Sequence, residues 1–316
     1  MGRLLVGRLT DLLIVLFGVS VITFAFVRMI PGDAVAIMLG ANTEVTPERM
    51  EAVRARLGLD QPVLTQYVDW LGNALRGDLG TSIWTGTPVT QEIASHIWPT
   101  LQLTVLSLLL AIVLAVPLGI LMARRRGKRG EGGLQAISVV GLTVPPFWLG
   151  ILLILFVSVV APSAQLLGYV PFTEDPLGNL RRLVLPAICL ALPITANLAR
   201  LLRSTLLEAL QQDYVRTARA KGVPDRRVLY RHALRNALIP FVTSVGIMAG
   251  YLLGGAIVIE QVFAIPGLGR LILGAIAERN YPLVQATILL VTCAFVMVNF
   301  IVDLLYALID PRVSGR

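Results

Sequence analysis

Long apolar runs without charged side chains recur along the chain and are separated by shorter polar segments. Six of the runs are long enough to cross about 30 Å of hydrocarbon as helices. They comprise residues 12–30, 101–123, 134–160, 183–199, 236–259 and 281–302. Only the first run contains a charge, Arg28, which is close enough to its end to reach the membrane interface. The pattern predicts an all-α integral membrane protein with six transmembrane helices.

Composition places the chain in the same class. Hydrophobic residues make up 56% of the 316 residues, charged residues make up 15%, and the mean hydropathy is +0.77. A soluble protein usually has about 25% charged residues. The first run follows Arg3 and Arg8, as in a secretory signal, but its exit at Arg28 and Pro31 has no small-x-small cleavage site. We therefore expect an uncleaved first helix.

Lys and Arg are distributed unevenly between the two sides of the predicted bundle. The side that holds both termini and the segments 124–133 and 200–235 carries 18 of the 27 basic residues. Cytoplasmic loops are enriched in Lys and Arg, so both termini are predicted to be cytoplasmic. The net charge of +8 is thus explained by topology and by attraction to anionic lipid headgroups. Aromatic residues do not alternate with the basic ones as in RNA-binding surfaces, and no nucleic-acid partner is expected.

Three parts of the chain are expected from these patterns. Residues 1–98 hold the first transmembrane helix and an extracytoplasmic helical segment, residues 99–309 form a core of five transmembrane helices, and residues 310–316 are a cytoplasmic tail. In the outer segment, one helix is predicted between Thr46 and Gly58, and Pro62 opens another. The second has an apolar stripe: Leu64, Tyr67, Val68, Leu71 and Leu75. The stripes could pack on neighbouring helices or receive a binding protein.

Within the core, the cytoplasmic loop at about 203–235 contains a basic helix-Gly-Pro-helix segment. Gly222 can end a helix in the left-handed conformation, and Pro224 suits the first turn of the next helix. Small residues stand just before this corner: Thr217, Ala218 and Ala220. They would let the surface of another protein approach the backbone closely. The segment indicates the coupling loop of a membrane transporter; a basic helix that only fixes topology would explain the charge but not the small residues.

An outer element follows the fifth apolar run. Residues 260–270 include Pro266, Gly267 and Gly269, and an apolar stretch too short to span comes next. This pattern suggests a helix that turns and lies back on the outer mouth of the bundle. Irregular backbone near membrane depth must be buried in protein or face a water-filled cavity. Phe263, Pro266, Gly267 and Gly269 are therefore a candidate outer gate, and an interfacial loop without substrate contact is the alternative.

Enzymatic motifs are missing from the sequence. It has no Gly-x-x-x-x-Gly-Lys-Ser/Thr phosphate loop, so the chain is not expected to bind or hydrolyse ATP by that route. No catalytic or metal-binding residues are predicted, and His96 and His232 are interpreted as polar surface residues. Cys189 and Cys293 fall inside predicted spans and are expected to be buried structural thiols. Carboxylates are not expected inside the spans, and Glu260 and Asp303 are interpreted as anchors at helix ends.

Several stretches together resemble the permease subunits of ABC importers, especially the dipeptide, oligopeptide and nickel group. Residues 216–222 are similar to the Glu-Ala-Ala-x-x-x-Gly motif of their cytoplasmic loop, with Arg216 in place of the Glu and with Pro240 beyond the short consensus. The other similar stretches are Pro31-Gly32-Asp33, residues 57–62, Gly77-Asp78-Leu79-Gly80, residues 213–218, residues 263–269 and residues 303–312. The resemblance covers nearly the whole chain.

The resemblance implies a type I ABC importer permease fold and a set of partners. A second homologous permease subunit, giving a heterodimer, would complete the path, two ATPase subunits would use ATP and Mg, and an extracytoplasmic substrate-binding protein would deliver the cargo. This chain would bind no cofactor and would lie in a bacterial-type inner membrane as a multi-pass protein. The implied ATPase-coupling residues are Arg216, Thr217, Ala218, Arg219, Ala220, Lys221 and Gly222.

The cargo implied by the resemblance is a di- or oligopeptide, with nickel and glutathione as alternatives in the same group. His and Met clusters, which a metal-coordinating path would favour, do not occur in the predicted spans. A secondary carrier made of this chain alone is a different hypothesis. Transport by the purified single chain would favour the carrier, and an ATP-dependent association with ATPase subunits would favour the importer.

Overall fold

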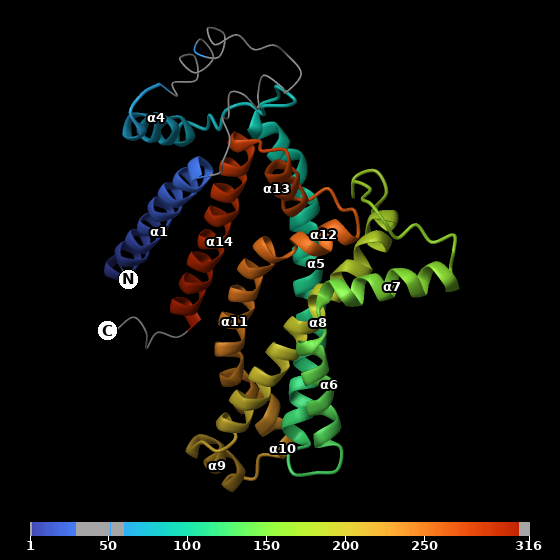
Figure 1. Cartoon of the computed structure of the whole chain (residues 1–316). Helices are drawn as coiled ribbons and strands as arrows, with labels where there is room; N and C mark the ends of the chain where they lie inside the picture. Colours follow the sequence, from blue (N-terminus) through green and yellow to red (C-terminus); the bar gives the residue numbers. More distant parts are fainter. Residues whose placement is uncertain (1, 30–50, 52–59, 310–316) are drawn as a thin grey trace.

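The computed structural model describes residues 2–29, 51 and 60–309. These residues form helices and connecting loops, with one isolated bridge between Thr81 and Pro88, so the predicted all-α class is confirmed for them (Figure 1). The helices are α1 (Gly2–Met29), α4 (Val63–Leu75), α5 (Val89–Arg124), α6 (Glu131–Thr143), α7 (Pro146–Val160), α8 (Pro176–Ala209), α9 (Asp213–Ala220), α10 (Asp225–Arg227), a π-helical turn (Val228–Ala233), α11 (Leu234–Gly255), α12 (Ile257–Val262), α13 (Leu268–Ala277) and α14 (Tyr281–Ile309).

Four helices are long and apolar enough to cross a membrane. They lie at Val89–Arg124, Pro176–Ala209, Asp225–Gly254 and Tyr281–Val302. The apolar stretch of α1, Thr10–Phe26, is shorter. If the bent pair formed by α6 and α7 counts as one span, the described residues contain up to 5 spans by length and composition. The sixth span and the orientation of the termini remain predictions.

The span predicted at residues 134–160 is sharply bent in the structure. It consists of two helices, α6 and α7, whose axes differ by 96°. Val144 between them is extended, with ψ of 119°, and is followed by Pro145 and Pro146. Proline lacks a backbone N–H and disfavours helical geometry in the residue before it. Therefore α6 ends before this pair, and α7 begins anew with Pro146 in its first turn.

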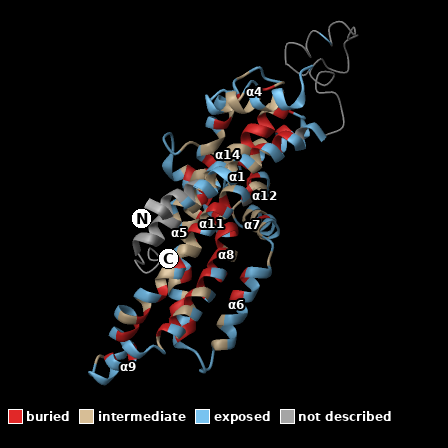
Figure 2. Ribbon diagram, turned by 90° about the vertical axis from the view of Figure 1, so that its left-hand side faces the viewer, coloured by how far each residue is buried: buried red, intermediate tan, exposed pale blue. Residues whose placement is uncertain are grey.

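The central helix of the bundle is α8, which packs against α5, α6, α7 and α11 (Figure 2). Its Leu198, Leu202 and Leu206 side chains are fully buried. α5 lies very close, because a Cβ atom added at Gly119 would be only 2.9 Å from the carbonyl oxygen of Ala199. In a membrane, such small-residue contacts matter because lipid gives helices little hydrophobic reason to associate. α8 thus forms a well-packed rod that leads directly to the loop containing α9.

The outer segment places α4 against α1. Tyr67 lies edge-on to Phe24 of α1, with 5.1 Å between the ring centroids. Other residues of the predicted apolar stripe point elsewhere, since Leu64 is 79% exposed and Val68 is 64% exposed. The stripe therefore packs on a neighbouring helix only in part. The helix predicted at residues 46–58 lies outside the described residues.

The two cysteines differ in their surroundings. Cys189 of α8 is buried in the core, as predicted, whereas Cys293 of α14 is exposed. The expectation of two buried thiols is therefore wrong for Cys293. Apolar composition marked α14 as a span, but it could not indicate which face of the helix the rest of the chain covers.

Candidate functional site

The predicted coupling segment, residues 213–235, lies at one end of the bundle and contains α9 and α10 on either side of the predicted corner (Figure 1). Gly222 follows α9 with a φ of +74°. Its backbone N–H donates to the carbonyl of Arg219 at 2.9 Å, and that of Val223 donates to the carbonyl of Ala218 at 3.2 Å. This pair of bonds is a Schellman motif, which requires a left-handed residue where Gly222 stands. The predicted helix end and corner are confirmed.

One face of α9 packs on its own chain. Val215 and Ala218 form a small apolar cluster with Val228 of the π-helical turn. Ala218 is only 8% exposed. The expectation that all the small residues before the corner are open to a partner is therefore wrong for Ala218. The other predicted coupling residues are exposed: Arg216, Thr217, Arg219, Ala220, Lys221 and Gly222.

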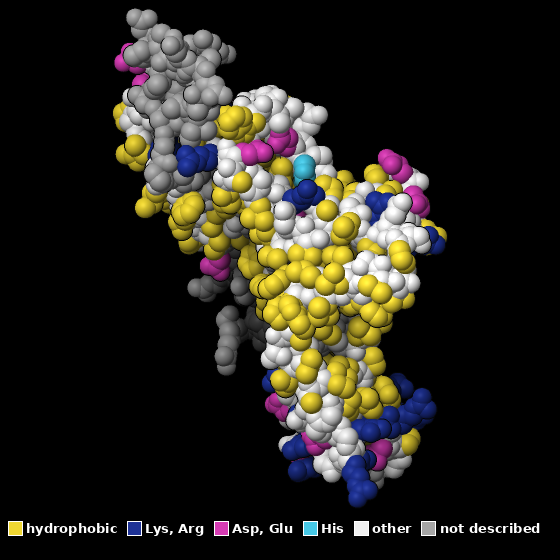
Figure 3. Space-filling view, turned by 45° about the vertical axis from the view of Figure 1, so that its right-hand side comes forward, with side chains coloured by type: hydrophobic (Ala, Val, Ile, Leu, Met, Phe, Trp, Pro, Cys, Tyr) yellow, Lys and Arg dark blue, Asp and Glu magenta, His cyan; other side chains and the backbone are white. Residues whose placement is uncertain are grey.

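Electrostatics leave the exposed face of α9 positively charged. Arg216 pairs with Asp213 at 3.4 Å, and Arg219 pairs with Asp225 at 3.2 Å. All four side chains are largely exposed, and ion pairs of this kind contribute at most about 1 kcal/mol. Arg216 and Arg219 can therefore leave these carboxylates and pair with carboxylates of a partner at little cost in free energy. Lys and Arg side chains gather at this end of the molecule, below a band of hydrophobic side chains (Figure 3).

α9 is attached to two long helices. Only residues 210–212 separate it from the end of α8. On the other side, the Asn236 amide of α11 donates a hydrogen bond to the Tyr214 hydroxyl at 2.9 Å. A displacement of α9 would therefore act on both α8 and α11.

The turn predicted at residues 260–270 joins α12 to α13, and these two helices pack against each other. Phe263 is fully buried and lies against α7, where a Cβ atom at Gly150 would be 2.9 Å from its ring. The Phe263 side chain thus packs between the turn and α7 and does not face open space. Gly267 has a φ of −102°, so left-handed backbone is not the reason for glycine there. The residue with positive φ in this turn is Ala264, at 54°.

A buried carboxylate organises the turn. Glu260 is 0% exposed. Its Oε1 accepts a hydrogen bond from the Thr100 hydroxyl of α5 at 2.6 Å, and its Oε2 accepts from the backbone N–H groups of Gly269 and Arg270 at 2.8 and 3.1 Å. The Thr100 hydroxyl in turn accepts from the N–H of Leu268 at 2.8 Å. Glu260 therefore satisfies the N-terminus of α13, where a negative charge is favoured, and ties α12 and α13 to α5.

The glycines of the turn make room for this carboxylate. A Cβ atom at Gly267 would overlap the Glu260 carboxyl group, and one at Gly269 would lie 2.5 Å from Cα of Ile257. The interpretation of Glu260 as an anchor at a helix end is corrected, because the residue is wholly inside the protein. An acidic residue placed shortly before a Pro-Gly-x-Gly sequence was the available signal.

Among the described residues, no group of three or more His, Cys, Asp or Glu side chains could hold a metal ion. The two candidate sites therefore consist of packing surfaces and hydrogen bonds. One is an exposed basic corner fixed to two long helices, and the other is a turn locked by a buried carboxylate.

This arrangement defines the class of protein, a helical membrane protein with several long apolar helices and an exposed, basic helical corner at one end. The family model described as binding-protein-dependent transport system inner membrane component matches residues 115–315. Its N-terminal companion, the membrane component N-terminal model, matches residues 1–88. The chain belongs to this family, and its resemblance to ABC importer permeases is confirmed.

Similar proteins align over nearly the whole chain. A Brucella abortus (strain 2308) protein named for a peptide transport system permease is 42% identical over 313 residues, covering 99% of each chain. The glutathione transport system permease protein GsiC of Escherichia coli O6:H1 is 41% identical over 311 residues, covering 98% of each. The di/tripeptide transport system permease protein DppB of Pseudomonas aeruginosa is 40% identical over 329 residues, again covering 98% of each.

The fold is also found in a solved structure. A chain of the MetNI methionine ABC transporter, in inward-facing conformations, superposes with a TM-score of 0.57 at 20% identity. The match covers 70% of this chain and 97% of that chain. An ABC importer permease fold is therefore shown for this part of the chain.

Proposed function

We propose that the chain is one of two permease subunits of an ABC importer for peptides. A second, homologous permease subunit completes the path, two ATPase subunits bind ATP and Mg, and an extracytoplasmic binding protein delivers the cargo. Both termini and the coupling segment face the cytoplasm of a bacterial-type cell, with the chain in the inner membrane. The chain itself binds no cofactor in this proposal.

The observation that carries the proposal is the exposed corner at Gly222. Apart from its two chain neighbours, no described residue lies within 4 Å of the position that a Cβ atom at Gly222 would occupy. The left-handed turn alone does not require Gly, because Asn also adopts this conformation. A partner surface that packs into the open space beside Gly222 would be a second reason for a residue without a side chain. We assign this space, with Thr217, Ala220 and Lys221, to a groove of an ATPase subunit.

The attachments of α9 supply a route for coupling. When the ATPase subunits close on ATP, they would move α9 as a rigid piece. Because α9 continues from α8 and is hydrogen-bonded to α11 through Tyr214, that movement tilts two long helices together. Packed helix bundles respond to such shifts by moving between discrete arrangements.

At the outer end, we assign the α12–α13 turn to the rim of the path. Glu260 holds the turn against α5, so the rim moves with that helix instead of opening alone. Pro266, Gly267 and Gly269 form the rim, and Phe263 supports it from the side of α7.

Peptide cargo is favoured by the names of the relatives. The Pseudomonas protein is named for di- and tripeptides, and the Escherichia protein for glutathione, which is itself a tripeptide. Glutathione is therefore the second candidate cargo. Nickel, in contrast, appears in none of these names.

The cargo prediction is tested by competition. Proteoliposomes containing the assembled transporter and its binding protein should take up a labelled tripeptide when ATP is supplied to the ATPase side. Excess unlabelled di- and tripeptides should suppress the uptake, whereas nickel ions should leave it unchanged. Suppression by glutathione but not by other tripeptides would assign the transporter to glutathione. Uptake by proteoliposomes that contain only this chain would contradict the importer proposal.

A further inference from the structure

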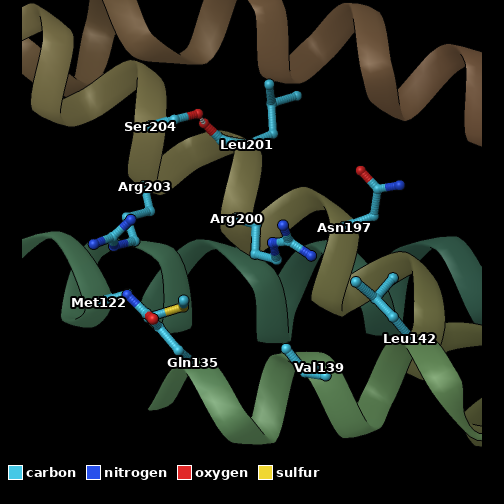
Figure 4. Close-up of a pocket in the computed structure, with 9 residues that line it drawn as sticks. All are labelled: Met122, Gln135, Val139, Leu142, Asn197, Arg200, Leu201, Arg203 and Ser204. Carbon is cyan, nitrogen blue, oxygen red and sulfur yellow. Dashed lines mark hydrogen bonds between the residues drawn. The ribbon is translucent and has the colours of Figure 1, made fainter. Parts of the chain in front are cut away.

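A cavity of about 600 Å³ lies between α5, α6 and α8, away from both candidate sites. α8 contributes most of its lining, and α6 forms the facing wall (Figure 4). The lining residues are Met122, Gln135, Val139, Leu142, Asn197, Arg200, Leu201, Arg203 and Ser204. The cavity is therefore bounded by hydrogen-bond donors on one helix and largely by apolar side chains on the other.

The donors in this cavity are incompletely used. Arg200 is exposed and has no ion-pair or hydrogen-bond partner among the described residues. Arg203 binds the Glu131 carboxylate through Nη2 at 2.5 Å, but its Nε is buried without a partner. With one arginine neutralised and the other free, the cavity keeps a net positive charge. Its unsatisfied groups are N–H donors, which match the oxygens of an anion.

The surface of α8 changes character along its length. In the half nearer its start, the exposed residues include Val184 and Ile188, which are apolar. In the half nearer its end, the exposed residues are Asn197, Arg200, Ser204 and Glu208, all of them polar or charged. Charged side chains on a spanning helix avoid lipid tails and lie at headgroup level or in water. Arg203 pairs with the first residue of α6, just after the loop whose basic residues predict the cytoplasmic side.

The facing wall continues as lipid-compatible surface. On α6, Val139 is 51% exposed and Leu142 is 37% exposed, and both lie farther from the basic loop than Gln135. An acyl chain could lie along this wall while its headgroup meets the arginines. A path for hydrated cargo would need polar lining on both walls, and the apolar Val139 and Leu142 do not provide it. The apolar wall thus favours a lipid over the cargo.

We propose that this cavity binds the headgroup phosphate of one anionic phospholipid of the cytoplasmic leaflet, through the guanidinium group of Arg200. The site goes beyond the transport function but rests on the cytoplasmic orientation proposed above. Phosphatidylglycerol, whose headgroup carries one anionic phosphodiester, has the required chemistry. Asn197 and Ser204 add neutral polar groups beside the phosphate.

Native mass spectrometry of the assembled transporter tests the site. Titration with phosphatidylglycerol should give a retained lipid that phosphatidylcholine at the same concentration does not replace. Arg200→Gln should weaken retention about fivefold, as expected for one basic residue at an anionic surface, and Arg200→Lys should restore most of it. Arg235→Gln is the matched control, since Arg235 is an exposed arginine outside the cavity. This control should retain the lipid as the unaltered protein does.

Two further arms separate the alternatives. Inorganic phosphate should not displace the lipid at millimolar concentration, because it lacks the acyl chain; displacement would contradict a lipid site and indicate a free-anion site. Equal loss of phosphatidylglycerol from Arg200→Gln and Arg235→Gln would show only general attraction and would overturn the proposal. The proposal would also be overturned if Arg200→Gln keeps the lipid but raises the KM for a peptide with a free carboxyl terminus. The cavity would then belong to the cargo path. Lipid retention is read on every species that contains this chain, with or without ATPase subunits, so a failure of ATPase docking would not remove this readout.

Discussion

Gly222→Trp should leave the chain folded and inserted but reduce substrate-stimulated ATP hydrolysis by about tenfold or more, equivalent to about 1.4 kcal/mol of lost interaction. The Cβ atom of the new side chain would have no described atom within 4 Å apart from those of the adjacent residues, so the indole would start from open space. It would occupy the space proposed for the ATPase groove. ATP hydrolysis by the assembled transporter, measured with and without the loaded binding protein, checks this result. Gly132→Trp is a matched control, since Gly132 also faces open space in a basic, exposed region.

Smaller substitutions at the same position separate bulk from backbone strain. A left-handed conformation costs a non-glycine residue about 1–2 kcal/mol, but Asn tolerates it better than Ala. If the partner groove is the constraint, Gly222→Asn should impair coupling more than Gly222→Ala. If the Schellman turn alone matters, the order should reverse, and the groove assignment would fail.

Gly269→Ala should largely abolish uptake, although it adds a single methyl group. Its Cβ atom would lie 2.5 Å from Cα of Ile257, a main-chain atom that no change of side-chain rotamer can move. Overpacking of this kind costs about 1–3 kcal/mol, so the α12–α13 turn should open or shift. Uptake and hydrogen exchange over residues 260–277 measure the effect. Gly274→Ala, in the same helix with open space, should behave as the unaltered protein.

A second variant tests the bonds of the turn without adding volume. Glu260→Gln keeps the shape, but only one end of its amide is an acceptor: with the oxygen on the N–H groups of Gly269 and Arg270, the NH2 faces the Thr100 hydroxyl, which loses its acceptor. An unsatisfied buried polar group costs about 1–3 kcal/mol. Exchange at the start of α13 should therefore rise, and uptake should fall. Normal uptake by both Gly269→Ala and Glu260→Gln would remove the turn from the mechanism.

Local features could be predicted from the sequence because their causes are local. The helix end at Gly222 depends on residues within a few positions, and glycine at that place has one common conformational use. The broken shape of residues 134–160 was also encoded locally, in Pro145 and Pro146. The apolar length of the run predicted a membrane segment, but it contained no information on the direction of the chain after the prolines.

Features that depend on distant partners could not be predicted in the same way. Glu260 looked like an interfacial anchor, and its burial depends on Thr100, which is 160 positions earlier in the chain. In the sequence, Ala218 belongs to a cluster of small residues expected to be accessible to a partner. In the structure, Val228 of the π-helical turn packs against it. Periodicity does not specify which face of an eight-residue helix is covered when the covering element is elsewhere. From the sequence, the arginines of the α6–α8 cavity indicate only the cytoplasmic side. Their position in a cavity depends on α6, which lies far from them in the sequence.

Contact between α9 and an ATPase subunit is the central claim, and site-specific photo-crosslinking measures it most directly. A benzophenone amino acid placed at Thr217 or Ala220, both exposed on α9, should give an adduct with the ATPase subunit in the assembled transporter. The yield should change on addition of ATP. The same probe at Asp69, an exposed position on α4, should give no such adduct. Adducts at Asp69 but none at Thr217 or Ala220 would contradict both the coupling assignment and the proposed orientation.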